Sequence, residues 1–322
     1  MEGLKMGRPG TILLTGGFGF IGAALARRLV GMGRNVAFVE LGPADSGRLG
    51  GSRGKVEVRE VDLRDHAGVM AAVREIAPDT IVHLAAYYSI DHRPEEVPAL
   101  VGTNVQGLAS LLEAARAAGT RLLINTSSCF VYEQTGKPLA EDGPMRPANL
   151  YALTKRAGEE LCGHYSSEYG MAISTLRIFS PYGPGDHDRR LIPSVIKSCL
   201  AGEAPRVSSG RQMWDFIYID DIVEAYVQAI GRLPDGHGTY NIGSGNAVAV
   251  RDIVSRIRQL MGPGPEPLWG AIPHRKSEIW SMTADITRAR RDLGWEPKTQ
   301  IMGEGLERTV RWFVEKYGGM PK

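Results

Sequence analysis

The chain has 322 residues, of which 43% are hydrophobic and 23% are charged. This balance is ordinary for a globular protein, excludes a disordered chain or a coiled coil, and leaves room for one large domain or two small ones. Because 38 basic residues nearly balance 36 acidic ones, to a net charge of +2, the chain has no electrostatic footprint for nucleic acid or an anionic membrane.

The beginning of the chain shares one feature with secretory signals. Lys5 and Arg8 precede a mostly apolar stretch over 11–25. The glycines in that stretch weaken an apolar helix, and no run of about 18 apolar residues appears elsewhere. We therefore expect neither a leader nor a transmembrane helix.

The first half of the chain alternates short apolar runs with helix-like segments. Strands buried on both faces are continuous apolar runs, whereas amphipathic helices repeat apolar residues every three to four positions. The predicted strands are 11–15, 35–40, 56–61, 80–84, 121–126 and 172–179. The predicted helices are 20–31, 66–76, 103–118 and 150–169, the last two ended by Gly119 and Gly170. This alternation predicts an α/β fold, a doubly wound parallel sheet of the Rossmann type with helices on both faces.

The second half is less regular. Gly and Pro predict loops over 180–188 and 262–273. The other predicted elements are helices over 191–201 and 222–230, a strand over 214–219 and two helices within 285–317. We expect a dinucleotide-binding domain over 1–179, to which 212–242 returns, and a smaller, discontinuous substrate-binding lobe over 180–211 and 243–322.

Three glycines, Gly16, Gly19 and Gly22, lie between the first strand and the first helix. Glycine here permits a tight turn, close approach of the backbone to a pyrophosphate, and close packing of helix on strand. The helix N-terminus offers its N–H groups to the phosphates. The pattern alone is weak evidence, but its position between strand and helix predicts a dinucleotide site.

Acidic residues end the next two predicted strands. Glu40 stands roughly 20 residues beyond the glycines, where a carboxylate accepts hydrogen bonds from the adenosine ribose hydroxyls. Because that charge repels the additional phosphate of NADP, we predict NAD as the cofactor; a solvated strand-end acid is the alternative. Asp62 either meets the adenine edge or caps the helix that follows.

Tyr151 and Lys155 are four residues apart on a predicted helix and so share one face. An ammonium near a phenol favours the phenolate, which lowers the tyrosine pKa and provides a general acid/base near neutral pH. Because this spacing is common by chance, an exposed surface pair is the alternative.

The order of the motifs is more specific than any one of them. The glycines are followed by His83-Leu84-Ala85-Ala86, then Thr126-Ser127-Ser128, then Tyr151 and Lys155. In this order the chain resembles the extended short-chain dehydrogenase/reductase family, in particular its NAD-dependent nucleotide-sugar epimerase, dehydratase and reductase branch. The resemblance runs from about Thr11 to Phe313 and includes 103–107, 182–185, 215–221 and 293–295.

The resemblance implies roles for individual residues. Ser128 would hydrogen-bond the reacting sugar oxygen, Tyr151 would be the acid/base, and Lys155 would bind the nicotinamide ribose and tune Tyr151. Asn104 would hold backbone near the site. Other positions implied to contact the cofactor are Gly16, Gly19, Phe20, Ile21, Gly22, Glu40, Asp62, Leu63, Leu84, Ala85 and Ala86. Positions implied to contact the substrate are Tyr88, Ser128, Cys129, Ser180, His187, Arg211 and Arg275.

The reaction implied by the resemblance takes place at C4 of a nucleoside-diphosphate sugar. Tyr151 would take the proton of the C4 hydroxyl while hydride passes from C4 to the nicotinamide, giving a 4-keto sugar. An epimerase returns the hydride to the other face, whereas a reductase runs only the return direction. We expect a 4-epimerase, with a 4-ketosugar reductase as the alternative. A non-catalytic dinucleotide-binding regulator and a dehydrogenase of non-sugar alcohols are alternatives of other classes.

Several positions depart from the family pattern. Cys129 and Phe130 stand where 4,6-dehydratases carry an Asp-Glu pair, so we do not expect a 4,6-dehydratase. Trp214 stands where many epimerases carry a diphosphate-binding arginine, and Ser180 where many carry asparagine. Both changes put UDP-galactose-type substrates in doubt.

The substrate candidates have structural alternatives. Arg211 and Arg275 are candidates for the diphosphate charge, and Arg211 is otherwise a solvated loop residue. Cys129 is either an acid/base or a small buried thiol. His187 either titrates in the substrate loop or is simply exposed. Tyr88 either faces the sugar or packs against the preceding tyrosine.

Cysteine and histidine give no further site. Cys129, Cys162 and Cys199 are too few and scattered for a disulfide framework and fit a reducing, cytoplasmic location. The seven histidines show no ligand spacing, so we predict no metal, and His83 is expected to be a core residue.

A homodimer is implied by the resemblance, with the helices over 103–118 and 150–169 packing into a four-helix bundle. Leu108, Leu111, Leu112 and Ala115 form an apolar stripe on the first of these helices. The same stripe could instead face only the sheet.

Overall fold

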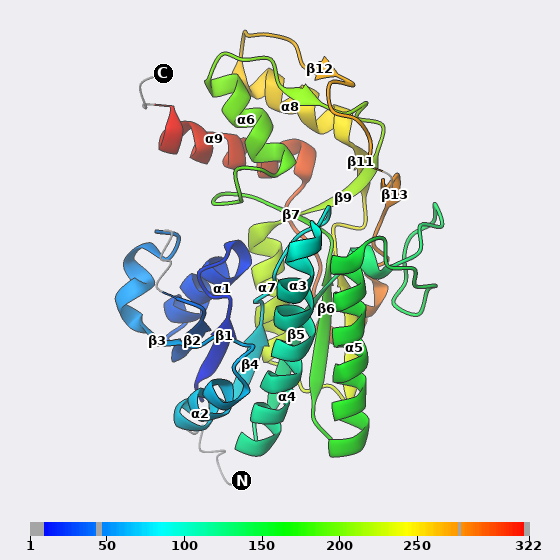
Figure 1. The fold of residues 1–322 in the computed structure, drawn as a ribbon. Helices are drawn as coiled ribbons and strands as arrows, with labels where there is room; N and C mark the ends of the chain where they lie inside the picture. Colours follow the sequence, from blue (N-terminus) through cyan, green and yellow to red (C-terminus); the bar gives the residue numbers. More distant parts are fainter. Residues whose placement is uncertain (1–9, 43–46, 276–277, 319–322) are drawn as a thin grey trace, which may run out of the picture. The chain divides into compact units, whose positions relative to one another are not determined.

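The computed structural model describes residues 10–42, 47–275 and 278–318, which form two compact units (Figure 1). Unit 1 comprises the described parts of Met1–Ser128, Asn149–Leu176 and Tyr226–Thr239. Unit 2 comprises those of Cys129–Ala148, Arg177–Ala225 and Tyr240–Lys322. The assignment of one domain to the cofactor and the other to the substrate stays a prediction. Lys5 and Arg8 lie outside the described residues.

Unit 1 is built on a seven-stranded sheet of order β10-β6-β5-β4-β1-β2-β3. Its strands are β1 (Ile12–Thr15), β2 (Val36–Glu40), β3 (Val56–Glu60), β4 (Thr80–His83), β5 (Leu122–Ser128), β6 (Ile173–Ile178) and β10 (His237–Ile242), of which β6 and β10 continue into unit 2. The pairs β1–β2, β1–β4, β2–β3 and β4–β5 are parallel. Because the strand order reverses between β1 and β4, the predicted doubly wound α/β fold is confirmed.

The helices of unit 1 are α1 (Phe20–Gly31), α2 (His66–Ile76), α3 (Val97–Val101), α4 (Gly107–Ala118) and α5 (Leu150–Tyr169). The predicted ends of α1, α2 and α5 are confirmed. Asn149 caps α5 by accepting from the N–H of Ala152. Gly119 and Gly170 end α4 and α5, each with a left-handed φ of 67° that favours glycine.

One predicted helix was wrong at its start. The helix expected from Thr103 begins earlier, because α3, a π-helical turn over Gly102–Gln106 and α4 are continuous. A proline in the first turn of α3 suits that position, since its missing N–H is unpaired there in any case.

The apolar stripe on α4 packs into the core of unit 1. Leu108, Leu111, Leu112 and Ala115 are at most 1% exposed and cluster with apolar side chains of the sheet, such as Leu13. The stripe therefore faces the sheet, which is the second of the two alternatives, and it does not supply a dimer surface.

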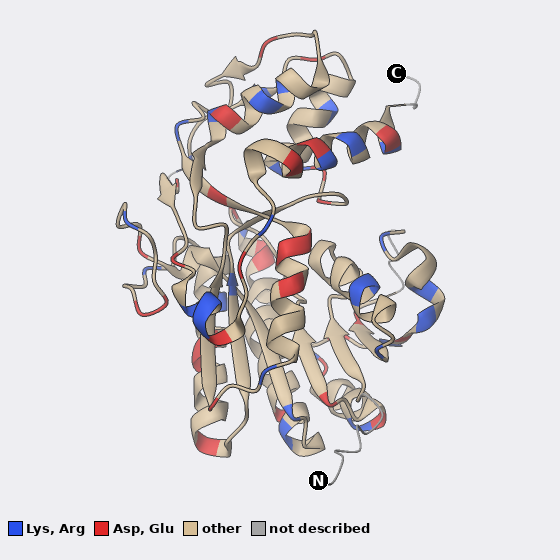
Figure 2. Ribbon diagram, turned by 180° about the vertical axis from the view of Figure 1, so that it is seen from behind, with Lys and Arg blue, Asp and Glu red and all other residues tan. Residues whose placement is uncertain are grey.

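The described part of unit 2 holds shorter strands and several helices, and the prediction placed them only in part. In one group of paired strands, β7 (Ser180–Tyr182), β11 (Ala247–Ala249) and β13 (Ser281–Met282) each pair with β9 (Met213–Tyr218). In a separate two-stranded sheet, β8 (Arg206–Val207) pairs with β12 (Leu268–Trp269). The helices of this unit are α6 (Leu191–Leu200), α7 (Ile219–Ile230, which continues into unit 1), α8 (Val250–Met261) and α9 (Leu306–Tyr317). Acidic and basic residues are mixed along α8 and α9 (Figure 2).

The predicted loops over 180–188 and 262–273 were partly wrong. Each contains a short strand, because its backbone pairs with a strand distant in sequence: β7 pairs with β9, and β12 pairs with β8.

Helix α7 begins at Ile219, three residues before its predicted start. A short helical turn over Ala289–Leu293 and α9 lie on either side of Trp295, which confirms the two C-terminal helices. Within the described ranges no helix has the length and apolarity to cross a bilayer.

Candidate active site

The turn between β1 and α1 requires glycine at two positions. Gly16 has a left-handed φ of 73°, and a Cβ there would lie 2.7 Å from the backbone nitrogen of Ala85. A Cβ at Gly22 would lie 2.1 Å from the carbonyl oxygen of Gly16. Gly19 is the N-cap of α1 and makes no side-chain cap, so the first turn of the helix presents its N–H groups outward. This cradle, which a side chain would fill, fits a pyrophosphate.

The carboxyl ends of β1 and β4 meet at the point where the strand order reverses. Thr15 Oγ1 lies 2.8 Å from His83 Nδ1 and accepts a 3.2 Å hydrogen bond from the N–H of Ala85. His83 is 1% exposed, and burial lowers its pKa to about 3, so the ring is neutral. The predicted core histidine is confirmed, and its contacts hold the segment from Leu84 to Ala86 at the edge where Rossmann sheets bind ligands.

Glu40 ends β2 beside the glycine turn. Its Oε1 accepts a 3.3 Å hydrogen bond from the N–H of Phe18. Burial raises the pKa of Glu40 to about 7, against the lowering effect of the N–H groups of Phe18 and Gly17. A partly buried carboxylate at this place suits a hydrogen bond from a ribose hydroxyl. A solvated strand-end acid, which is the alternative, would be exposed.

The remaining cofactor candidates of unit 1 differ in their surroundings. Asp62 forms an ion pair with Arg64, which lowers the pKa of that carboxyl. The capping alternative for Asp62 is wrong, because Asp65 is the residue that caps α2 by accepting from Gly68 N. Phe20 and Ile21 are half-buried in the first turn of α1, whereas the Leu63 side chain packs in the core of unit 1.

Tyr151 and Lys155 are buried on α5, at 8% and 6% exposure, so the alternative of an exposed surface pair is wrong. Lys155 Nζ donates to the carbonyl oxygen of Thr126 at 2.9 Å and lies 5.9 Å from the centre of the Tyr151 ring. Desolvation lowers the pKa of Lys155 to about 8. Ser128, two residues after Thr126, ends β5 and is 7% exposed. The structure therefore brings the phenol, the ammonium and Ser128 to the same end of β5, and their roles in the reaction stay a prediction.

Asn104 organises the segment after β4. Its Oδ1 accepts from Tyr87 N at 2.8 Å, and its Nδ2 donates to Tyr87 O at 3.0 Å and to Thr154 Oγ1 at 2.9 Å. Thr154 in turn donates to the carbonyl oxygen of Tyr151. The ring of Tyr88 packs edge-on against Tyr151, with ring centres 4.9 Å apart. Sequence reasoning missed Thr154, whose only signal was its place within the Tyr-x-x-x-Lys segment.

The remaining substrate candidates belong to unit 2, and their roles stay predictions. Cys129 is 4% exposed, as a small buried thiol would be, and Ser180 is buried in β7. His187 and Arg211 are exposed, and His187 Nδ1 accepts from the N–H of Arg189. Arg275 is exposed.

Glu278 anchors the loop that carries Arg275. Its carboxylate accepts from Gln212 Nε2 at 2.9 Å and from Arg275 N at 3.1 Å. Trp214, at the place of the family arginine, donates from Nε1 to the carbonyl oxygen of Ile279 at 2.8 Å. The Trp214 side chain therefore binds backbone of its own unit.

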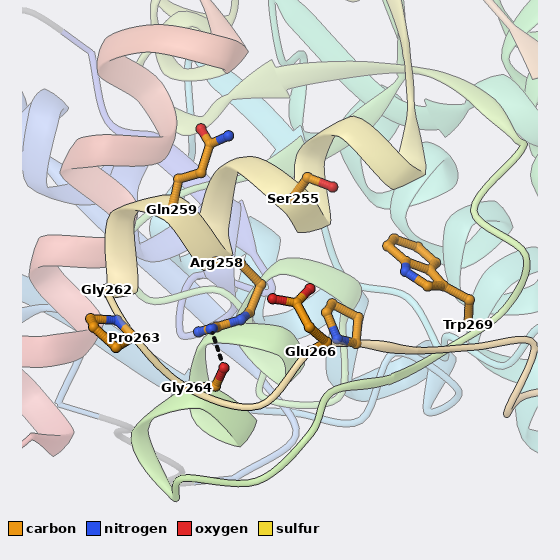
Figure 3. A pocket seen from close by; sticks show the side chains of 9 residues that line it. Ser255, Arg258, Gln259, Gly262, Pro263, Gly264, Glu266 and Trp269 are labelled. Atoms are coloured by element: carbon orange, nitrogen blue, oxygen red, sulfur yellow. Dashed lines mark hydrogen bonds between the residues drawn. The ribbon is translucent and has the colours of Figure 1, made fainter.

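A pocket of about 580 Å³ lies in unit 2 between α8 and the loop before β12 (Figure 3). Arg258 donates to the carbonyl oxygen of Gly264 across it, which holds the loop to the helix. None of the candidate cofactor or substrate residues lines this pocket, so we assign it no part in the reaction. Among the residues that the structure describes, no group of His, Cys, Asp and Glu side chains is arranged to hold a metal ion.

The sheet order, the glycine cradle and the buried Tyr151–Lys155 pair define a dinucleotide-dependent enzyme of the short-chain dehydrogenase/reductase type. A family model described as the NAD dependent epimerase/dehydratase family matches residues 12–243. The chain belongs to this family, which confirms the resemblance and the expectation of an NAD-dependent enzyme.

Similar proteins come from several organisms. The chain is 32% identical over 314 residues to a UDP-glucose 4-epimerase of Mycolicibacterium smegmatis, covering 94% of this chain and 98% of the relative. It is 30% identical to UDP-glucuronate 4-epimerase 3 of Arabidopsis thaliana, over 99% of this chain and 80% of the relative. The structure of Thermus thermophilus UDP-glucose 4-epimerase in complex with NAD aligns with a TM-score of 0.84 at 28% identity, over 94% of this chain and 98% of that chain.

Proposed function

We propose that the chain is a nucleotide-sugar 4-epimerase that acts through a transient 4-keto sugar. The observation that carries the proposal is the buried pair of Tyr151 and Lys155, with Lys155 hydrogen-bonded to the β5 strand that Ser128 ends. The names of the relatives, which are 4-epimerases of UDP-glucose and UDP-glucuronate, support the sugar-nucleotide class.

The chain's own residues divide the work. The turn over Gly16–Gly22 holds the pyrophosphate of NAD and Glu40 accepts from its adenosine ribose. When bound, NAD accepts the hydride of C4 and returns it to the opposite face. Ser128 donates to the C4 oxygen, and Tyr151 takes the C4 hydroxyl proton and later gives it back. The Lys155 ammonium favours the phenolate form of Tyr151. Since hydride and proton are both returned, the cycle needs no external oxidant or reductant.

Turnover without added cofactor tests the proposal. Purified protein is incubated separately with UDP-glucose and UDP-glucuronate, and the C4 epimers are followed by NMR spectroscopy. We expect one of these sugars to approach an equilibrium mixture, and mass spectrometry of the denatured protein to release NAD or NADH. An inactive protein that consumes a 4-ketosugar only with added NADPH would instead establish the reductase alternative. A protein that binds NAD and converts neither sugar under any of these conditions would contradict both.

Cofactor binding is expected to depend on the ionisation of Glu40. Because its pKa is raised to about 7 and its carboxylate accepts from the ribose, NAD should bind more tightly as the pH rises from 6 to 8. Glu40→Gln should remove this rise and weaken NAD binding by roughly tenfold or more, as expected for loss of a charge-assisted hydrogen bond. Isothermal titration calorimetry at each pH measures both effects.

The control for Glu40 is its neighbour in register, the exposed Glu60 at the end of β3. Glu60→Gln should leave the pH profile of NAD binding unchanged. The NAD-free protein offers a second check. Since the folded state raises the pKa of Glu40 from 4.5, the stabilisation from its proton is complete below pH 4.5 and is lost as the pH rises through about 7. Equal pH profiles for wild type and Glu40→Gln would contradict the assignment.

We also propose a cytoplasmic homodimer. Cys129, Cys162 and Cys199, all within the described residues, form no disulfide bond, as a reducing compartment would require. Leu153 and Tyr169 on α5 are exposed apolar residues on a helix that the family resemblance places at the dimer contact. Light scattering on the eluting protein measures the mass, and a monomer at micromolar concentration would contradict the dimer.

A further inference from the structure

A buried carboxylate that none of the roles above uses lies one helical turn beyond Lys155. Glu159 is on α5, four residues after Lys155 and eight after Tyr151, so the three side chains lie along one face of the helix. Its side chain is 4% exposed. A carboxylate at this depth is costly unless it is paired and hydrogen-bonded.

Two successive residues of β5 attach the strand to this face of α5. Lys155 Nζ donates to the carbonyl oxygen of Thr126 at 2.9 Å, and Ser127 Oγ donates to Glu159 Oε1 at 2.5 Å. The next residue along the strand is Ser128. The hydrogen bond of Glu159 therefore helps to fix the strand end that carries Ser128 and the carbonyl group that holds Lys155.

The groups that raise the pKa of Lys155 are Cys162 and Glu159, of which Glu159 is the carboxyl group. His83 faces Lys155 from β4 and is neutral. Cys162 follows on α5 and stays a neutral thiol, because burial raises its pKa. Glu159 acts on Lys155 in the opposite direction to desolvation, raising its pKa. Arg156, 3.5 Å from Glu159 Oε2, also pairs with the exposed Glu160.

We propose that Glu159, held by Ser127, is a positioning residue that keeps the Lys155 ammonium protonated and fixed at the carbonyl group of Thr126. It touches neither substrate nor cofactor and acts on Tyr151 through Lys155. Only the expected effect on kcat rests on the proposed function. The expected effect of Glu159 on NAD binding follows from the role of the Lys155 ammonium toward the nicotinamide ribose.

The pH profile of NAD binding tests the proposal, and Glu159→Gln is the main variant. In the wild type, NAD affinity should fall as the pH rises through about 8 and Lys155 loses its proton. In Glu159→Gln this fall should occur about one pH unit lower, since the charge of a buried carboxylate that raises the pKa of Lys155 is lost. If the proposed function holds, kcat at pH 8 should fall roughly fivefold with little change in KM, because the protonated fraction of Lys155 falls from about one half to about one tenth.

Two further variants separate charge from structure. Glu160→Gln lies beside Glu159 on the same helix and shares Arg156, but is exposed, so its profile should match the wild type. Ser127→Ala removes the hydrogen bond to Glu159 and keeps the carboxylate. The pH at which NAD affinity falls should therefore also be lower than in the wild type, but by less than in Glu159→Gln.

The outcomes are decisive in each case. A folded Glu159→Gln protein whose NAD profile coincides with that of the wild type would overturn the proposal. If Glu159→Gln does not fold, an unshifted profile in Ser127→Ala would overturn it instead. If the wild type converts no sugar nucleotide, the proposed function fails, whereas the NAD titration still decides the role of Glu159.

Discussion

Tyr151→Phe should lower kcat by about 10²–10⁴-fold while NAD binding stays within a fewfold of the wild type. The substitution keeps the ring and removes the phenolic oxygen, which is the group proposed to exchange the C4 proton. The ring is buried, packs against Tyr88 and lies under the Lys155 ammonium, so the fold should be preserved. Initial rates of sugar-nucleotide conversion and a calorimetric NAD titration measure the two quantities.

A control on the same helix isolates the role of the hydroxyl group. Tyr169 is 52% exposed at the far end of α5, and Tyr169→Phe should leave kcat unchanged. Activity of Tyr151→Phe within threefold of the wild type would place the acid/base elsewhere. A biological function that survives Tyr151→Phe would favour the dinucleotide-binding regulator over an enzyme.

Gly22→Ala should destabilise the protein by about 1–3 kcal/mol, the usual cost of overpacking, and should abolish measurable NAD binding. The added Cβ would lie 2.1 Å from the carbonyl oxygen of Gly16 and 2.8 Å from the Cα of Gly17. Both neighbours are backbone atoms, so the clash is relieved only by moving α1 away from the turn. Urea unfolding and calorimetry measure the two effects.

The same helix offers a matched control. Gly31 ends α1, and a Cβ there would meet nothing within 4 Å. Gly31→Ala should therefore stabilise the protein by about 0.5–1 kcal/mol through helix propensity and leave NAD binding unchanged. Equal stabilities for Gly22→Ala and Gly31→Ala would show that the close approach of α1 to its turn is not needed.

Local patterns were sufficient for most of unit 1. The ends of α1, α2 and α5 follow from apolar spacing and from a glycine such as Gly170, which are properties of neighbouring residues. A comparable signal for α8 was overlooked, since Val250, Ile253, Val254 and Ile257 recur at helical spacing and are all buried. The short strands β7 and β12 had no such signal, because each exists only through pairing with a distant strand.

The residues of the candidate site could likewise be predicted from the sequence in part, whereas their burial and contacts required the structure. The glycines, Glu40, Tyr151 and Lys155 could be chosen from sequence because their chemistry depends on residue type and spacing. Burial of the Tyr151–Lys155 pair, which excludes an exposed surface pair, could be seen only from the packing of α5 on β5. The partner of Asp62 also required the structure. Both Arg64 and the N-terminus of α2 are close to Asp62 in the sequence, so sequence distance did not distinguish an ion pair from a helix cap.

The sequence by itself therefore determined the doubly wound sheet, and it identified the glycine turn and the Tyr151–Lys155 pair as candidates for the site, because each depends on short-range periodicity or a fixed spacing. Only the tertiary structure decided that the stripe on α4 faces the sheet, that Tyr88 packs on Tyr151 and that Ser127 binds Glu159. Ser127 and Glu159 are 32 positions apart in the sequence, and Tyr88 and Tyr151 are 63 positions apart. No local pattern specifies such distances, because they are set when separate elements pack together.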